Sequence, residues 1–396
     1  MKASLARAAG TDADAHDAAR AMNAFAFDLD RLLAEGNANY VFSPASIAIA
    51  LGMARTGARG DTATQMDAVL REVASDDHAS WLNALDQALA ARNGSFADDE
   101  GTMHELVLEI ANSYFAQRGF TFEAAFLDAL AERYGAGMHV VDFKADPDGA
   151  RRLINEWGAE QTRGRIPEVL RPPDVTSDTR LALVNAIYLK APWFRPFDEE
   201  RTTTEDFHRT DGSTVEVPMM HSFTGVRCTT ADNWGAFEIP YVAQKLAMLV
   251  VVPDDLEAFE EGFGSETFDR IETMLDAEFA VPVVSLPRFK VETREELSGR
   301  LTGMGMPSAF DPTRADFSGM TGDEPLHIGK VIHQANISVD EKGTEAAAVT
   351  VVGMDTGGGP TDECVVSASR PFIYAVRDTE TGAILFMGRV VDPTAG

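Results

Sequence analysis

This chain of 396 residues contains only two cysteines, Cys228 and Cys364, which excludes a disulfide-rich framework and any CxxC redox or zinc motif. We expect both to be free thiols. The sequence also lacks a run of about 18 apolar residues, so no segment is expected to span a membrane. Its first 20 residues lack the continuous apolar core of a signal peptide. These absences predict a cytoplasmic protein; secretion through a leader removed from this chain is the alternative.

Basic residues are scarce, because 34 Lys and Arg stand against 63 Asp and Glu, for a net charge of -29. The acidic excess is spread along the chain and forms no tail. Such a charge repels phosphate backbones and anionic membranes. We therefore expect neither nucleic acid nor membrane among the partners.

Enzyme signatures are missing as well. The sequence has no GxSxG elbow, no P-loop, no GxGxxG and no HExxH, and its eight histidines lack metal-ligand spacing. The triple glycine at 357–359 is followed by Pro360, which is typical of a linker and not of a phosphate cradle. We expect no catalytic residue, no cofactor and no metal.

What the sequence does contain is a succession of helix patterns followed by strand patterns. Ser43 and Pro44 form a helix start, in which a capping side chain precedes the residue best suited to the first turn. Helices are predicted at 17–35, 44–57, 61–72, 79–91, 121–134 and 147–162. Strands are predicted at 105–115, 181–189, 246–253, 280–293, 331–339, 364–376 and 383–391, with main loops at 93–103 and 353–363. Without βαβ alternation this order predicts an α+β fold, and we expect one domain over residues 1–396.

The segment at 339–349, VDEKGTEAAAV, combines a strand pattern with small residues. Gly343 can adopt backbone angles that other residues avoid. Thr344 and the three alanines at 346–348 leave nothing bulky to obstruct insertion between two strands. Val349 to Val352 then favour extended structure. The segment is therefore a candidate moving part.

Seven segments in order resemble the serpin family, the serine protease inhibitors. They are NYVFSPASIAIALGM at 39–53, NEWGAEQTRGRIPEVL at 155–170, TRLALVNAIYLKAPWFRPF at 179–197, LPRFKVETREEL at 286–297, the segment at 339–349, RPFIY at 370–374 and FMGRVVDP at 386–393. The resemblance implies a prokaryotic inhibitory member with the serpin fold. That fold has about eight to nine helices over three β-sheets and an exposed reactive-centre loop, here at about 343–363.

The resemblance also implies three groups of site residues. The hinge comprises Glu341, Gly343, Thr344, Glu345, Ala346, Ala347 and Ala348. The shutter, a hydrogen-bonded cluster beneath the central sheet, comprises Ser43, Ser46, Asn185 and His333. The breach, where the loop first enters the sheet, comprises Trp193, Arg288 and Glu341, with Arg288 paired to Glu341. Without the resemblance, the shutter residues would be interpreted as a helix cap and a buried histidine with hydrogen-bond partners, with no functional role.

The implied mechanism is a suicide-substrate reaction. A target protease cleaves the loop and forms an acyl-enzyme, and the cut loop inserts as a new central strand that traps the covalent complex. The family's usual spacing of 17 residues from Glu341 gives Gly357 and Gly358 as the reactive-centre bond. Counting back from RPF points near Pro360, and Met354, Asp355 and Thr356 are further alternatives.

The loop sequence narrows the target class. No Lys or Arg lies between Lys342 and Arg370, whereas trypsin-like proteases need a basic residue for their specificity pocket. We therefore expect a serine protease of elastase, chymotrypsin or subtilisin type, with subtilisin type preferred. The helix predicted at 79–91 and the segment SFADDE at 95–100 are acidic or neutral, which disfavours activation by a heparin-type polyanion. The resemblance implies a monomer able to form loop–sheet polymers. The alternative is a non-inhibitory serpin acting as a chaperone or binding protein, and a hydrolase is more remote.

Overall fold

The computed structural model describes residues 5–71, 75–277, 281–344 and 363–395. These residues contain nine α-helices: α1 (Asp12–Leu33), α2 (Pro44–Gly57), α3 (Gly60–Val69), α4 (Ser75–Ala90), α5 (Ala124–Tyr134), α6 (Pro147–Gln161), α7 (Leu256–Gly262), α8 (Ser265–Ala277) and α9 (Ser298–Met304). Short 3-10 turns occupy Glu199–Arg201, Val242–Gln244 and Pro307–Phe310. None of these helices is long and apolar enough to cross a membrane.

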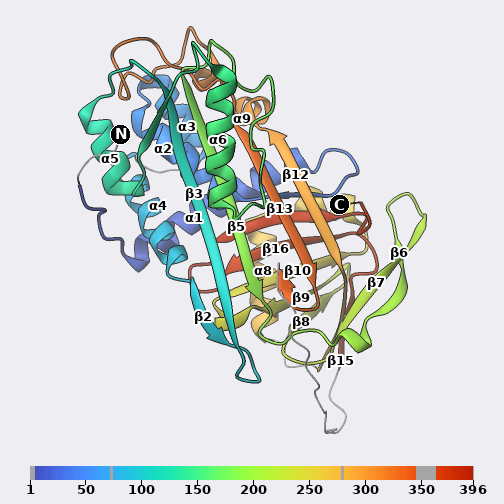
Figure 1. Ribbon diagram of the computed structural model, residues 1–396. Helices are drawn as coiled ribbons and strands as arrows, with labels where there is room; N and C mark the ends of the chain where they lie inside the picture. Colours follow the sequence, from blue (N-terminus) through green and yellow to red (C-terminus); the bar gives the residue numbers. More distant parts are fainter. Residues whose placement is uncertain (1–4, 72–74, 278–280, 345–362, 396) are drawn as a thin grey trace.

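The largest sheet, called the central sheet below, has seven strands. In spatial order they are β12 (Phe289–Glu296), β13 (Ile332–Asp340), β14 (Gly343–Thr344), β5 (Leu181–Pro192), β3 (Met103–Gln117) and β2 (Gly94–Ala97), with β4 (Met138–Val141) paired to β3. Its outer face is crossed by α6, which runs along β3 and β5 (Figure 1). The two-residue β14 is the shortest strand in this sheet.

Two further sheets lie behind and beside the central sheet (Figure 1). The rear sheet contains β1 (Tyr40–Phe42), β17 (Ile384–Val390), β16 (Phe372–Asp378), β10 (Leu246–Pro253), β9 (Trp234–Pro240) and β8 (Arg227–Ala231). The side sheet contains β15 (Glu363–Ser367), β11 (Val281–Pro287), β7 (Thr214–Ser222) and β6 (Thr203–His208). The predicted α+β class is confirmed.

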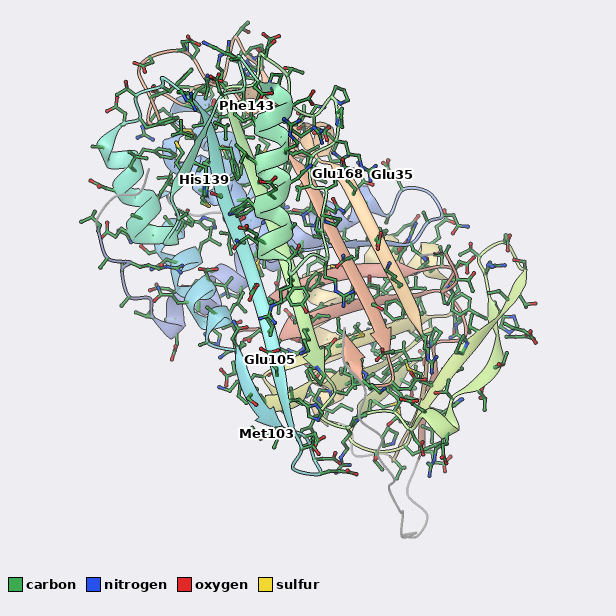
Figure 2. The ribbon with its side chains drawn as sticks, in the orientation of Figure 1. Glu35, Met103, Glu105, His139, Phe143 and Glu168 are labelled. Atoms are coloured by element: carbon green, nitrogen blue, oxygen red, sulfur yellow. A yellow bond between two sulfur atoms is a disulfide. The ribbon has the colours of Figure 1, made fainter. Side chains whose placement is uncertain are left out.

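The core explains why the sequence forms these layers. All eight residues of β10 are buried, as expected for an apolar run covered on both faces. The main hydrophobic cluster joins α1 and α2 to the rear sheet and the inner face of the central sheet. A second cluster under α6 includes Val184 of β5, Ile332 of β13 and Phe143. Figure 2 labels Phe143 near the upper end of α6. The inner face of the central sheet is thus buried by the main cluster, and part of its outer face is covered by α6.

Three predicted elements were wrong in detail. The run at 280–293 is two strands, β11 and β12, which belong to different sheets. The run at 364–376 likewise divides into β15 and β16. Pro287 ends β11 and Pro371 precedes β16, and a proline cannot donate to a strand ladder. The loop predicted at 93–103 contains β2, which forms a hairpin with β3.

The expectation of two free thiols was also wrong. Cys228 of β8 and Cys364 of β15 form a disulfide, with the sulfurs 2.00 Å apart and the Cα atoms 6.0 Å apart. The two cysteines are separated by 136 positions in the sequence. Only the packing of the side sheet against the rear sheet brings them together, and no spacing rule indicates that contact.

Candidate functional site

The hinge begins as a short strand already seated in the central sheet. Thr344 pairs with Val339 of β13 on one side and with Ala191 of β5 on the other. Gly343 has φ +144°, and a Cβ atom at this position would lie 2.3 Å from the carbonyl oxygen of Ala191. Glycine is therefore required where the chain turns into β14, and only a residue without a side chain can approach β5 so closely.

The hydroxyl of Thr344 is held by a residue that the sequence motifs do not include. It lies 2.7 Å from the hydroxyl of Tyr241, and both side chains are buried. Trp193 stacks on Tyr241 with ring centroids 4.4 Å apart, and its indole N–H donates to the carbonyl oxygen of Asp340 at 2.9 Å. The breach tryptophan therefore supports both the tyrosine and the turn before β14. Tyr241 follows β9 in a region with no recognisable motif, so nothing in the sequence indicates this role.

Arg288 and Glu341 are paired as the resemblance implies. The guanidinium donates through Nε to Oε2 at 2.8 Å and through a terminal nitrogen to Oε1 at 2.6 Å, which is a two-pronged contact. Thr202 adds a hydrogen bond to Oε1 at 2.6 Å. Burial acts to raise the pKa of Glu341, but the hydrogen bonds from Arg288 and Thr202 outweigh it and hold the pKa below its ordinary value. The pair fixes the start of the hinge as a charged, ordered turn.

The four shutter residues lie together beneath β5 and β13. The backbone N–H of Ser43 donates to Nε2 of His333 at 3.0 Å, and the hydroxyl of Ser43 caps α2 by accepting from the N–H of Ser46 at 3.2 Å. Asn185 donates to the carbonyl oxygen of Ser46 at 2.8 Å. Asn185 also donates to the side-chain oxygen of Asn112 on β3 at 2.6 Å, and Asn112 was not among the predicted residues. The cluster thus ties α2 to three strands of the central sheet.

The shutter also contains buried polar atoms without hydrogen-bond partners among the described residues. They are Oγ of Ser46, Oδ1 of Asn185 and Nδ1 of His333. Because Nε2 of His333 accepts a hydrogen bond, the proton of the neutral ring is carried by Nδ1. The cluster therefore retains both donor and acceptor capacity next to the sheet, and unpaired groups of this kind are costly when buried.

Replacing His333 by alanine should remove the acceptor for the buried N–H of Ser43. We expect a loss of about 1–3 kcal/mol in the free energy of unfolding, because that N–H would be left buried and unpaired. We also expect loop–sheet polymers, because β5 and β13 would separate more readily. Chemical denaturation and native gels of the variant test both. Unchanged stability together with a monomeric gel band would contradict the assignment.

The histidine also predicts a pH dependence. Burial lowers the pKa of His333 from 6.5 to about 4. The unfolded chain therefore binds a proton below pH 6.5 that the folded protein does not accept until about pH 4. Between these values, stability should fall as the pH falls, by up to about 3 kcal/mol from this residue. Denaturation of wild type and H333Q at a series of pH values measures the difference in stability, which should change between pH 4 and 6.5 and become constant above pH 7. Parallel curves over the whole range would contradict the prediction.

The space that an inserted strand would fill, between β5 and β13 beyond Thr344, is called the slot below. A cavity of about 990 Å³ opens over it, lined by Tyr188 and Lys190 of β5 and by Gln334, Asn336 and Ser338 of β13. Its outer surface is charged, since Lys190 contacts Glu105 of β3 at 3.1 Å. Figure 2 labels Glu105 on the lower part of β3. The slot is thus the wide, polar-rimmed part of the central sheet.

Several predicted site residues lie outside the described residues. They are Glu345, Ala346, Ala347 and Ala348 of the hinge and Met354, Asp355, Thr356, Gly357 and Gly358 around the reactive-centre bond. Their roles stay predictions. Within the part of the chain that the structure describes, no three His, Cys, Asp or Glu side chains are grouped in a way that could hold a metal ion.

The fold and this site define a class of protein with three β-sheets, in which a two-residue strand, β14, pairs between β13 and β5 of the central sheet. The serpin (serine protease inhibitor) family model matches residues 20–393, so the chain belongs to the serpin family. At the family level it is therefore a protease inhibitor and not a protease.

Individual relatives agree with this assignment. An uncharacterized serpin-like protein of Thermococcus kodakarensis is 39% identical over 95% of this chain and 86% of its own length. The leukocyte elastase inhibitor of Xenopus tropicalis is 35% identical over 93% of this chain and 97% of its own. Among solved structures, the thermophilic serpin tengpin in its native state has a TM-score of 0.85 at 25% identity, covering 98% of this chain and 97% of its own. The predicted serpin fold is confirmed.

Proposed function

We propose that this protein inhibits a serine protease as a suicide substrate. The protease cleaves the loop that follows β14, and the freed segment inserts into the slot before the acyl-enzyme is hydrolysed. The observation that carries the proposal is the position of β14. Thr344 already pairs with both β13 and β5, so insertion continues a strand that has begun.

The register of β14 supports a specific destination for the inserted residues. Continuing the two antiparallel ladders by six residues sets Thr350 opposite both His333 of β13 and Asn185 of β5. Directly opposed residues share a face of the sheet, so Thr350 would point toward the shutter. Its hydroxyl could accept from Nδ1 of His333 or donate to Oδ1 of Asn185, the atoms that lack partners before insertion. Insertion would therefore satisfy polar groups that the native state leaves unpaired.

The other inserted positions also suit their new neighbours. The same register sets Ala346 and Ala348 toward the packed interior, where small side chains fit between existing apolar residues. Glu345 would lie beside Lys190 on the outer face, and Val351 between Val184 and Ile332 in the second cluster. About ten new ladder hydrogen bonds at 0.5–1.5 kcal/mol each, with burial of the valines, give a driving force on the order of 10 kcal/mol.

For the target we propose a protease with a preference for small or apolar residues. The absence of Lys and Arg between Lys342 and Arg370 disfavours a trypsin-like enzyme. The leukocyte elastase inhibitors among the relatives support an elastase-like target, whereas chymotrypsin-like and subtilisin-like targets rest on the loop sequence alone.

Incubation with subtilisin, with elastase and with trypsin tests the proposal. We expect a covalent complex that survives denaturing electrophoresis with subtilisin or elastase, and none with trypsin. Mass spectrometry of the peptide released from the complex locates the cleaved bond, which we expect at Gly357–Gly358. A stable trypsin complex would refute the specificity. Cleavage by every protease without any complex would favour a non-inhibitory chaperone or binding protein.

A further inference from the structure

The Cys228–Cys364 disulfide joins two different sheets at one end of the loop. Cys228 belongs to β8 of the rear sheet, and Cys364 belongs to β15 at the edge of the side sheet. Both residues are buried, at 6% and 3% exposure. β15 is the first described element after the loop, and Figure 1 shows it at the bottom of the view, near the lower ends of β5 and β13. The bond therefore fixes the point at which the loop rejoins the body.

β15 has weaker attachments besides the disulfide. It pairs with β11 alone in its sheet, over Glu363 to Ser367. The hydroxyls of Ser285 and Ser367 lie 2.7 Å apart across this pair. Val366 packs so closely on Gly235 of β9 that a Cβ atom there would lie 2.7 Å from its side chain. These noncovalent contacts can break and let β15 detach from β11, whereas the covalent bond to the rear sheet holds β15 in place.

The chain length between β14 and Cys364 limits how far an uncut loop can enter the slot. Residues 345–363 join Thr344 to Cys364, nineteen residues in all. A loop that inserts without cleavage must also return to β15, so at about 3.4 Å per residue it can reach a depth of at most about nine residues. A reversing turn and the sideways step to the side sheet use several of these. The uncut loop therefore stops near Thr350.

Release of β15 would lengthen that path. The next attachments lie at Ser369, whose carbonyl oxygen accepts from the N–H of His208 at 2.8 Å, and at Arg370, whose side chain donates to the carbonyl oxygen of Pro253 at 2.9 Å. With β15 detached, residues 345–368 become available, and the accessible depth rises to about twelve residues. That is enough to extend the inserted strand beyond Thr350 and the shutter residues and to continue the ladder toward Leu181.

We propose that the disulfide is a clamp that permits insertion of the cleaved loop and prevents insertion of the uncleaved one. The inference rests on the proposed loop insertion. Cleavage at Gly357–Gly358 separates residues 345–357 from β15, so this segment inserts fully while the disulfide stays intact. An uncut loop has no such freedom as long as Cys364 is bonded to Cys228.

The clamp makes the lifetime of the active form depend on the redox state of this pair. A small dithiol that reaches the bond is oxidised to its own disulfide, and its two electrons and two protons convert the Cys228–Cys364 bond into two thiols. β15 can then leave β11, and the uncut loop can insert. The molecule then no longer inhibits a protease, because its loop is no longer available for cleavage.

The test compares wild type with C228A, C364A and the double variant during incubation without protease. We expect each variant to lose inhibitory activity at least about tenfold faster than wild type. The mass should be unchanged, and the product should resist both loop cleavage and heat better than the starting material. Because the clamp needs both sulfurs, the double variant should be no faster than either single one. The complexes formed at time zero should match those of wild type.

S285A/S367A is the matched control, since it weakens β15 without breaking the disulfide. It should retain activity nearly as long as wild type. Equal lifetimes for wild type and the cysteine variants would overturn the clamp while leaving the proposed function intact. If wild type forms no covalent complex at all, the proposed function fails instead. In that case the rate at which a protease cleaves the loop, compared between wild type and the cysteine variants, still shows whether the disulfide restrains the loop.

Discussion

Replacing Thr344 by arginine should convert the protein from an inhibitor into a substrate. Thr344 is buried between β13 and β5, with its hydroxyl on Tyr241, so an arginine there would place a charge in an apolar space without a partner. We expect β14 to be expelled and insertion to become too slow to compete with hydrolysis of the acyl-enzyme. Complex formation should fall by about two orders of magnitude, the effect of roughly 3 kcal/mol on the competing step. Denaturing electrophoresis of the protease reaction measures the ratio of complex to cleaved protein.

The matched control is T344V, which keeps the shape of threonine and removes only the hydroxyl. It leaves the hydroxyl of Tyr241 without its partner, at a cost of about 1 kcal/mol, but introduces no charge. We expect it to inhibit nearly as well as wild type. If T344R forms complexes as efficiently as T344V, then the residue at this position does not control insertion and the hinge assignment is wrong.

Replacing Arg288 by glutamate should shorten the life of the active form. The side chain of Glu341 is 4% exposed, and its carboxylate accepts hydrogen bonds from Arg288 and Thr202. A glutamate at position 288 would place a second negative charge beside the carboxylate of Glu341 and remove its hydrogen-bond donor. We therefore expect a loss of about 1–3 kcal/mol in the stability of the native state. Because this pair fixes the turn before β14, the breach should open more readily. Activity should decay roughly tenfold faster at a fixed temperature, corresponding to about 1.4 kcal/mol in the barrier.

The variant R288K separates the effect of the positive charge at position 288 from the effect of the hydrogen-bond geometry. A lysine keeps the positive charge but cannot make the two-pronged contact with Glu341. We expect its lifetime to lie between those of wild type and R288E. A long-lived active form of R288E would show that the pair is a solvated surface contact with little energetic weight.

Much of the fold follows from local sequence signals. The Ser43–Pro44 start and the apolar length of the following segment predicted α2 with the bounds that the structure has. The long apolar run of β10 predicted a strand covered on both faces. These elements are governed by capping and by burial, which act within a few residues. α7, α8 and α9 were not predicted, because α7 and α9 are only seven residues long and α8 is rich in acidic residues.

The sequence predicted a residue of the candidate site only where that residue lies within a recognised sequence motif. Arg288 and Glu341 lie in motifs, and the structure places them in contact. Tyr241 and Asn112 contact the site through packing between distant segments, and their own neighbourhoods carry no signal. The disulfide is the extreme case, because two isolated cysteines 136 residues apart are uninformative until the sheets are assembled.

The two pairs made by β14 bear on the kinetics of inhibition. Bringing a free loop end to a sheet requires loop closure, whose entropic cost must be met before any ladder bond forms. Under the proposed mechanism that nucleation step would be complete before the protease arrives, since Thr344 is already paired on both sides. The proposed insertion would then be the elongation of an existing strand, and short strand pairing of this kind takes roughly 1–10 μs. Turnover of an acyl-enzyme typically takes milliseconds or longer, at about 1–10³ s⁻¹. The fraction of proteases trapped should thus be set by how fast β5 and β13 separate, and not by the pairing itself.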